Sequence, residues 1–203
     1  MINTIIFDFG NVFINLDIEG FIAQTLKKLN INKIPEEIKA FNNVYEQGLI
    51  STNEFIEFYM ENFPSLSKED IIDTWNSILK HFPKHRLDFL KDLKTSNKYK
   101  LILLSNTNDL HINWIKENVS FYNEFKNCFD AFYLSHEINL SKPNADIYKF
   151  VLNTNSLKAE TCLFIDDNKD NIDSANTLGI HTWHINPETD DVSNLFKIKN
   201  NLF

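Results

Sequence analysis

The strongest constraint on the fold of this chain is a set of short, continuously apolar runs. The runs are TIIF at 4–7, KLILL at 100–104, AFYL at 131–134, CLFI at 162–165 and HTWHI at 181–185. A strand with one buried face alternates apolar and polar residues, whereas a strand covered on both faces is apolar throughout. Helical patterns lie between most of the runs, so we predict an α/β fold with a doubly wound parallel sheet.

The segment between the first two runs has helical patterns and no convincing strand. Ser51 with Glu54, and Ser67 with Asp70, have the spacing of capping boxes that begin helices. We expect the second of these helices to extend through Leu79 and to place it on an apolar face. We therefore predict a helical domain at 15–84, inserted after the first strand into a core domain made of residues 1–14 and 85–203.

Composition excludes several classes of function. The net charge is −8 and the pI about 5.2, which argues against a nucleic-acid partner. No apolar run approaches the ~20 residues that span a bilayer, so we expect no membrane partner. Cys128 and Cys162 fit no zinc or redox spacing and are expected to be small core residues. The first residues have no charged segment or cleavage site typical of a secretory signal, and we expect a reducing, cytoplasmic setting.

Polar residues follow three of the apolar runs directly. They are Asp8 after the first run, Ser105 and Asn106 after the second, and Asp166 and Asp167 after the fourth. Ligands bind outside the carboxyl ends of the strands in an open parallel sheet. Each of these residues alone is typical of a turn or a helix cap. Their repeated position at strand ends instead predicts one crevice that holds three acids and a hydroxyl.

Two adjacent carboxylates repel one another unless a cation or a hydrogen-bond network compensates. Mg²⁺ prefers oxygen ligands and is usually held by one or two carboxylates together with substrate phosphate. We expect Asp8 and Asp167 to bind Mg²⁺ directly and Asp166 to bind it directly or through water. The backbone carbonyl of Gly10 is a further candidate ligand, because glycine permits close backbone approach.

Lys142 is the candidate cation of the site. It precedes Pro143, and a proline at the first position of a helix would fix Lys142 just ahead of that helix. From there its ammonium could contact a phosphate or hold Asp8 ionised. A lone lysine in a loop is also commonly just solvated.

Taken together, four segments resemble the haloacid dehalogenase (HAD) superfamily of aspartate-nucleophile hydrolases. The segments are IIFDFGNV, LILLSNTN, SKPNADIY and LFIDDNKDNIDSANTLGI, in the order and with the spacing of that family. The resemblance covers nearly the whole chain and is closest to the phosphatase branch that includes bacterial alpha-D-glucose-1-phosphate phosphatase. It implies a Rossmann-like HAD core, and the inserted helical domain corresponds to the small cap of the family.

The resemblance also implies roles for individual residues. Asp8 is the nucleophile and Lys142 the charge neutraliser. Asn11, Ser105, Asn106 and Lys142 would bind phosphate, while Asp8, Gly10, Asp166 and Asp167 would form the metal site. The implied function is a Mg²⁺-dependent phosphatase of a small phosphorylated metabolite, a sugar phosphate, acting through an aspartyl-phosphate. We expect a monomer or a small homo-oligomer.

Two other functions stay open at this point. One is a metal-independent 2-haloacid dehalogenase, a branch that generally lacks the acids found here at 166 and 167. The other is a catalytically weak binding or regulatory protein that keeps the fold, since fold does not decide function.

The chain departs from most phosphatases of the family at Gly10, where they have an aspartate that handles protons. General acid–base help is typically worth ~10²–10⁴ in rate. Asp17, Glu46, Asp109 and His111 are candidates for this role, and water or groups of the substrate itself are alternatives. The segment 45–52, with Gly48 as a flexible point, is either a substrate-contact loop of the cap or an ordinary helix–helix turn.

Overall fold

The computed structural model describes residues 1–203 and contains one parallel sheet of five strands in the order β3-β2-β1-β4-β5. The strands are β1 (Thr4–Phe7), β2 (Lys100–Ser105), β3 (Ala131–Leu134), β4 (Cys162–Asp166) and β5 (His181–His184). The predicted doubly wound parallel sheet is confirmed. β4 extends one residue beyond its apolar run and therefore ends on a carboxylate.

The strands are apolar throughout because both faces of the sheet are covered. In β1, Ile5 and Phe7 belong to the larger hydrophobic core, while Ile6 lies in a second core on the opposite face. Leu103 and Ile102 of β2 divide between the two cores in the same way. Successive side chains point to opposite faces of a strand, so a strand between two helical layers needs apolar residues at every position.

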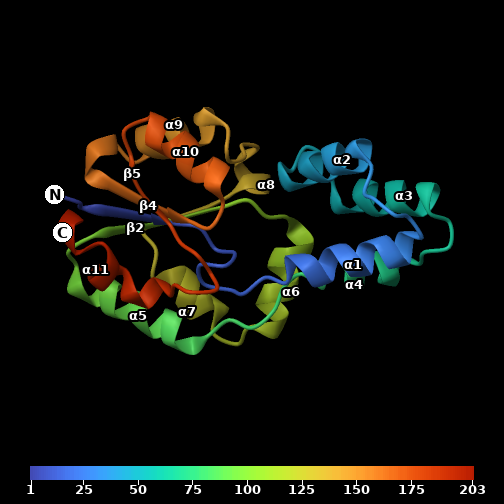
Figure 1. Ribbon diagram of the computed structural model, residues 1–203, viewed down its shortest axis with the longest axis horizontal. Helices are drawn as coiled ribbons and strands as arrows, with labels where there is room; N and C mark the ends of the chain where they lie inside the picture. Colours follow the sequence, from blue (N-terminus) through green and yellow to red (C-terminus); the bar gives the residue numbers. More distant parts are fainter.

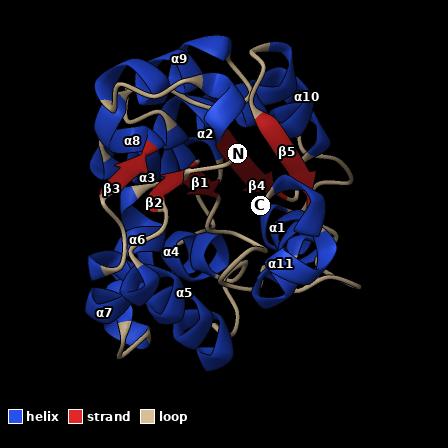
Figure 2. Cartoon of the chain, turned by 90° about the vertical axis from the view of Figure 1, so that its left-hand side faces the viewer, coloured by secondary structure: helices blue, strands red, loops and turns tan.

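Two helical layers sandwich the sheet (Figures 1 and 2). One layer contains α9 (Ala145–Thr154) and α10 (Lys169–Thr177). The other contains α5 (Lys84–Ser96), α7 (Tyr122–Asn127) and α11 (Leu195–Ile198). α6 (Asp109–Asn118) follows β2, and the short α8 (Ser135–Ile138) follows β3.

Cys128 and Cys162 are buried and unpaired, as expected of small core residues. No helix of the chain has the length and apolarity that crossing a membrane requires.

Four helices form a separate lobe beyond the carboxyl ends of the strands (Figure 1). They are α1 (Ile18–Leu29), α2 (Glu36–Glu46), α3 (Thr52–Asn62) and α4 (Lys68–Asn76). Both predicted capping boxes are formed, at Ser51 with Glu54 and at Ser67 with Asp70. The domain boundaries at 15 and 84 stay a prediction.

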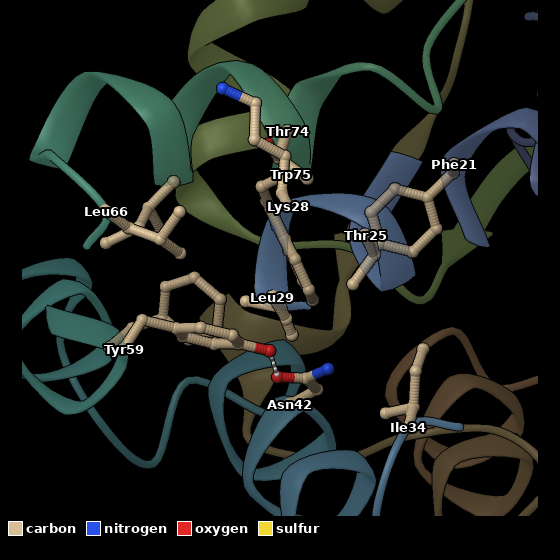
Figure 3. Close-up of a pocket in the computed structure, with 12 residues that line it drawn as sticks. Phe21, Thr25, Lys28, Leu29, Ile34, Asn42, Tyr59, Leu66, Thr74 and Trp75 are labelled. Atoms are coloured by element: carbon tan, nitrogen blue, oxygen red, sulfur yellow. Dashed lines mark hydrogen bonds between the residues drawn. The ribbon is translucent and has the colours of Figure 1, made fainter. Parts of the chain in front are cut away.

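The core of this lobe is aromatic. Tyr59 donates a 2.8 Å hydrogen bond from its hydroxyl to Asn42 Oδ1, beside a cavity of about 30 Å³ that Trp75 also lines (Figure 3). A cavity of that size holds about one water molecule. The aromatic residues of the lobe therefore pack its core and do not enclose a substrate.

The expectation that a helix continues through Leu79 was wrong. α4 ends at Asn76, and Leu16 and Leu79 form an isolated antiparallel bridge. Lys80 N donates to Asn15 O at 3.0 Å, so the two connections between lobe and core pair with one another. Leu79 is apolar because it packs in the main core beneath this paired connection.

Candidate active site

Three carboxylates meet at the carboxyl end of the two central strands. β1 and β4 are neighbours, with Phe7 opposite Ile165, so Asp8, Asp166 and Asp167 emerge side by side. Each offers one oxygen, and these oxygens lie within 4.8 Å of one another. The parallel register therefore builds the acidic cluster from two segments far apart in the sequence.

Lys142 is buried between two of these acids. Its Nζ lies 2.9 Å from Asp8 Oδ1 and donates to Asp166 Oδ2 at 2.6 Å. The side chain of Lys142 is 1% exposed, so its charge is compensated by carboxylates and not by solvent.

Asn106 holds the backbone of Lys142 in place. Asn106 Nδ2 donates to the Lys142 carbonyl at 2.8 Å, and Lys142 N donates to Asn106 Oδ1 at 3.0 Å. The expected position of Pro143 at the first turn of a helix was wrong, because α9 begins at Ala145 with Asn144 as its N-cap. A side-chain amide from the end of β2, and not a helix start, positions Lys142.

Asp166 is fully buried and its oxygens are saturated. Oδ1 accepts hydrogen bonds from Asn168 N at 2.8 Å and Asn171 Nδ2 at 3.1 Å. Oδ2 accepts from Lys142 Nζ and from Asn171 Nδ2 at 3.0 Å. These contacts leave no free position for a direct metal bond, so Asp166 fits a role in holding Lys142 and the start of α10.

Asp167 is oriented by the loop after β1. Asn11 Nδ2 donates to Asp167 Oδ2 at 2.7 Å, and Asn11 Oδ1 accepts from Leu16 N at 3.0 Å. Burial raises the pKa of the Asp167 carboxyl, while the hydrogen bond from Asn11 opposes the shift. The structure thus engages Asn11 with a carboxylate, and its expected contact with phosphate stays a prediction.

Burial and the neighbouring acids make the ionised form of Asp8 unfavourable in the absence of a metal ion. Burial raises its pKa to about 7; the charge of Lys142 opposes this shift, and Asp166 and Asp167 add to it. Asp8 Oδ1 is buried and accepts no hydrogen bond, although the Lys142 ammonium lies beside it. Oxygen ligands in this state match the preference of a hard divalent cation, which would lower the pKa of Asp8.

Two hollows that share lining residues adjoin the acidic cluster. The first is an open cleft lined mainly by polar residues, among them Asp8, Asn106, Lys142, Asp167 and Lys169. The second is a smaller chamber of about 110 Å³ between lobe and core, lined in part by Gly10, Glu46, Ser105 and His111. Leu16 and Asn106 line both hollows, so the chamber adjoins the cleft. Ser105 is buried there, and its hydroxyl makes one long contact of 3.4 Å, to the Asn106 carbonyl.

Two of the four candidate proton donors are engaged away from the hollows. Asp17 accepts a 2.8 Å hydrogen bond from Gly20 N as the cap of α1 and pairs with Lys80. Asp109 lies 3.5 Å from His136 Nε2 and lines neither hollow. Neither residue is placed to exchange a proton with a substrate.

The other two candidates line the chamber. His111 Nε2 lies 3.1 Å from the Trp75 carbonyl, and burial lowers the His111 pKa to about 4, which leaves the imidazole neutral at pH 7. Burial alone raises the pKa of the Glu46 carboxyl to about 7. Glu46 is thus the candidate whose proton affinity suits acid and base work near neutral pH.

The segment 45–52 is docked on the core and does not hang free over the cleft. Ser135 Oγ donates to the Glu46 carbonyl at 2.5 Å, and Asn139 Nδ2 donates to the Gln47 carbonyl at 2.9 Å. Gly48 has φ of +66°, and a Cβ there would lie 2.0 Å from the His136 carbonyl oxygen. Gly48 is thus a place of close backbone contact, and its role as a flexible point stays a prediction. Within this segment only Glu46 lines the chamber.

Comparisons with known proteins identify the family of the chain. Residues 2–179 match the family model of haloacid dehalogenase-like hydrolases. A D-ribitol-5-phosphate phosphatase of Bacteroides thetaiotaomicron is 27% identical over 191 residues, which cover 90% of this chain and 91% of that protein.

Solved structures extend the likeness to the whole fold. A HAD family enzyme from Bacteroides thetaiotaomicron, in complex with magnesium and inorganic phosphate, is 33% identical with a TM-score of 0.84, over 97% of this chain and 99% of that one. A predicted HAD-like hydrolase from Porphyromonas gingivalis is 27% identical with a TM-score of 0.83, over 98% of both chains. A dehalogenase at 16% identity and a TM-score of 0.62, covering 97% of this chain and 96% of that one, shares the fold alone.

Proposed function

This chain belongs to the haloacid dehalogenase-like hydrolase family, and from that premise we propose that it is a Mg²⁺-dependent phosphatase of a small phosphorylated metabolite. We further propose a sugar phosphate or the related polyol phosphate as the substrate class. The relative that acts on D-ribitol 5-phosphate supports this class. One observation carries the proposal: Asp8, the proposed nucleophile, contacts the ammonium of Lys142. Asp167, a second acid, lies beside them in the same cleft.

The residues present fit a magnesium ion. Asp8 and Asp167 would supply carboxylate oxygens, since Asp166 is saturated by hydrogen bonds. The Gly10 carbonyl accepts one hydrogen bond, from Val12 N at 2.7 Å, and keeps a second lone pair for an ion. A structure of a similar HAD enzyme solved with magnesium supports this choice of ion. When bound, the ion would neutralise charge on the transferring phosphoryl oxygens.

The mechanism then follows from positioning and charge. An Asp8 oxygen attacks phosphorus in line and forms an aspartyl-phosphate as the bond from phosphorus to the leaving alcohol oxygen breaks. Lys142 stabilises negative charge on the phosphoryl oxygens, which Ser105 and the Asn106 backbone help to hold. Water then attacks phosphorus, releases phosphate and restores Asp8. Asp166 acts through Lys142 by fixing its ammonium between the two carboxylates.

The two alternative functions fit the site less well. A metal-independent dehalogenase has no use for Asp167, which Asn11 orients toward the acidic cluster. A binding protein without turnover has no need to bury Lys142 against Asp8 at a strand end, because burying such a pair costs desolvation energy.

Phosphate release from p-nitrophenyl phosphate and from a panel of sugar and polyol phosphates tests the proposal. We expect turnover with Mg²⁺, loss of turnover with EDTA, and loss in Asp8→Asn. Turnover that persists in EDTA or in Asp8→Asn would contradict it. Chloride release from 2-chloropropionate without metal would support the dehalogenase instead.

A further inference from the structure

The chamber between lobe and core contains one carboxyl group that the proposed function leaves without a role. Phosphate-ester hydrolysis makes an alkoxide leaving group that needs a proton, and none of the three acids of the metal cluster is placed to give one. Asp8 is the attacking group, Asp166 is saturated by hydrogen bonds, and Asp167 faces the metal position. The proton therefore has to come from outside the metal cluster.

The loop after β1 cannot supply it. A Cβ added at Gly10 would lie 2.7 Å from Leu16 Cδ1, because the Leu16 side chain fills the space that a residue 10 side chain would enter. Leu16 itself lines both hollows as an apolar wall. The chamber behind Leu16 has one carboxylic acid in its lining, Glu46, and this residue comes from the lobe.

We propose that Glu46 is the catalytic acid and base of this site, an inference that rests on the proposed phosphatase function. Glu46 is the last residue of α2, the helix that reaches the core beside α8 (Figure 1). It lines the same chamber as Gly10 and Ser105, and it is the only carboxylic acid to do so. The chamber adjoins the cleft at Leu16 and Asn106, which line both, and we place the leaving group of a bound ester on the chamber side.

The backbone around Glu46 is fixed while its carboxyl is left free. Ser135 Oγ donates to the Glu46 carbonyl, and Asn139 Nδ2 donates to the carbonyls of Gln47 and Gly48 at 2.9 and 3.2 Å. No group in the structure hydrogen-bonds or ion-pairs the Glu46 carboxyl. Glu46 is partly exposed to solvent, and an acid whose backbone is fixed while its carboxyl stays free is pre-positioned for proton transfer.

No charged group opposes this role from the chamber walls. The remaining lining residues are mostly apolar, among them Phe9, Ile14, Ile78, Leu79 and Ile115. The other titratable group there is His111, which is bound to the Trp75 carbonyl and stacked on the Trp75 ring. Burial is accordingly the single cause of the raised pKa of Glu46, about 7, so both the protonated and the ionised carboxyl are populated near neutral pH.

The proton balance closes over two steps. In the first, an Asp8 oxygen bonds to phosphorus, the bond from phosphorus to the leaving oxygen breaks, and that oxygen takes the proton of Glu46. In the second, the Glu46 carboxylate takes a proton from water as the water oxygen bonds to phosphorus. The bond from phosphorus to Asp8 breaks, and phosphate leaves with both Asp8 and protonated Glu46 restored.

The test compares Glu46→Gln with wild type on two leaving groups in Mg²⁺. D-Ribitol 5-phosphate has a basic alkoxide leaving group, and p-nitrophenyl phosphate has a weakly basic one that leaves without a proton. We expect kcat on the alkyl ester to fall about 10²–10⁴-fold. On the aryl ester the first step stays fast and the second slows, so phosphorylated Asp8 accumulates in a burst of p-nitrophenol. Glu46→Asp should recover part of the alkyl-ester activity.

Glu57→Gln is the matched control, because Glu57 is exposed on α3 of the same lobe. Thermal unfolding of each variant separates a folding defect from a chemical one. Equal losses on both esters with no burst, or no loss on either, would overturn the role of Glu46 while leaving the phosphatase function intact. A wild-type enzyme that releases no phosphate from any ester would instead overturn the proposed function. If D-ribitol 5-phosphate is not a substrate, the best alkyl phosphate of the panel takes its place.

Discussion

Asn11 and Asp167, 156 positions apart in the sequence, are joined by a 2.7 Å hydrogen bond from the Asn11 amide to Asp167 Oδ2. This bond ties the loop after β1 to the loop after β4 across the candidate metal site. The bond fixes the position of Asp167 Oδ2 and thereby orients the carboxylate relative to Asp8. Loss of a residue that orients a metal ligand typically costs about 10–100-fold in metal affinity.

Asn11→Ala should therefore weaken Mg²⁺ binding by about 10–100-fold. Titration of activity with Mg²⁺ at saturating substrate measures the effect directly. Inhibition by inorganic phosphate at saturating Mg²⁺ provides the contrast. If Asn11 instead holds phosphate, phosphate inhibition will weaken while the Mg²⁺ requirement stays unchanged.

Lys142→Ala should abolish turnover and also destabilise the fold. The substitution leaves Asp166 fully buried without its ammonium partner, and breaking a buried ion pair costs about 3–5 kcal/mol. Urea unfolding of the metal-free protein measures this cost. Lys169→Ala is the control, because Lys169 lines the same cleft but pairs only with exposed Asp173 on the surface of α10. A Lys142→Ala variant as stable as that control would contradict the buried pair.

The metal-free protein should lose stability as pH rises from about 4 to about 7. Burial raises the pKa of Asp8 from 3.8 to about 7, so over this window the folded state holds a proton that the unfolded state has released. The Asp8 contribution to the free energy of unfolding then falls with increasing pH.

Thermal unfolding in EDTA between about pH 4 and 7 should show this decrease in stability, and Asp8→Asn should make the pH dependence less steep. Glu46, with its pKa raised to about 7, adds a slope of the same sign that remains in Asp8→Asn. An unchanged slope in Asp8→Asn would count against the raised pKa of Asp8.

Magnesium should remove the Asp8 part of that pH dependence and stabilise the fold. An ion that binds only the folded state at a hundred times its Kd adds about 2.7 kcal/mol to the free energy of unfolding. Melting curves with and without Mg²⁺ at pH 7 test this, with Asp167→Asn as the variant expected to lose the shift. Equal shifts in wild type and Asp167→Asn would place the ion elsewhere.

Gly48→Ala should loosen the contact between lobe and core. The new Cβ would lie 2.0 Å from the His136 carbonyl oxygen, and overpacking of this kind costs about 1–3 kcal/mol. Because Glu46 precedes this contact, kcat should fall. Gly179→Ala is the matched control, since Gly179 also has positive φ, at +81°, but a Cβ there would make only an ordinary van der Waals contact, 3.9 Å from Ala159 Cβ. Equal kcat in the two variants would show that docking of the lobe does not position Glu46.

The strands followed from sequence because they rest on local pattern, and the acidic cluster followed from the rule that ligands bind at the carboxyl ends of parallel strands. Continuous apolar runs identified strands covered on both faces, and the parallel order then placed Asp8 beside Asp166 and Asp167. The capping boxes at Ser51 and Ser67 formed as predicted because all their contacts lie within four residues.

Contacts between distant side chains had no such signal. Nothing local indicates that Asn106 would clamp Lys142 or that Gly48 would meet His136. The end of α4 before Leu79 was also missed, because its apolar spacing continues past Asn76 although Leu79 packs in a different core. In each case the structure depends on contacts between residues far apart in the sequence. A single sequence shows the residues but not which of them are in contact.

The most direct test of the central claim is to look for a phosphoryl group on Asp8 during turnover. Wild-type protein mixed with p-nitrophenyl phosphate and Mg²⁺, quenched in acid and analysed by peptide mass spectrometry, should carry one added phosphoryl group on the peptide with Asp8. The group should be absent in EDTA and in Asp8→Asn. Sustained phosphate release with no phosphorylated Asp8, and with Asp8→Asn as active as wild type, would contradict an aspartyl-phosphate mechanism at this site.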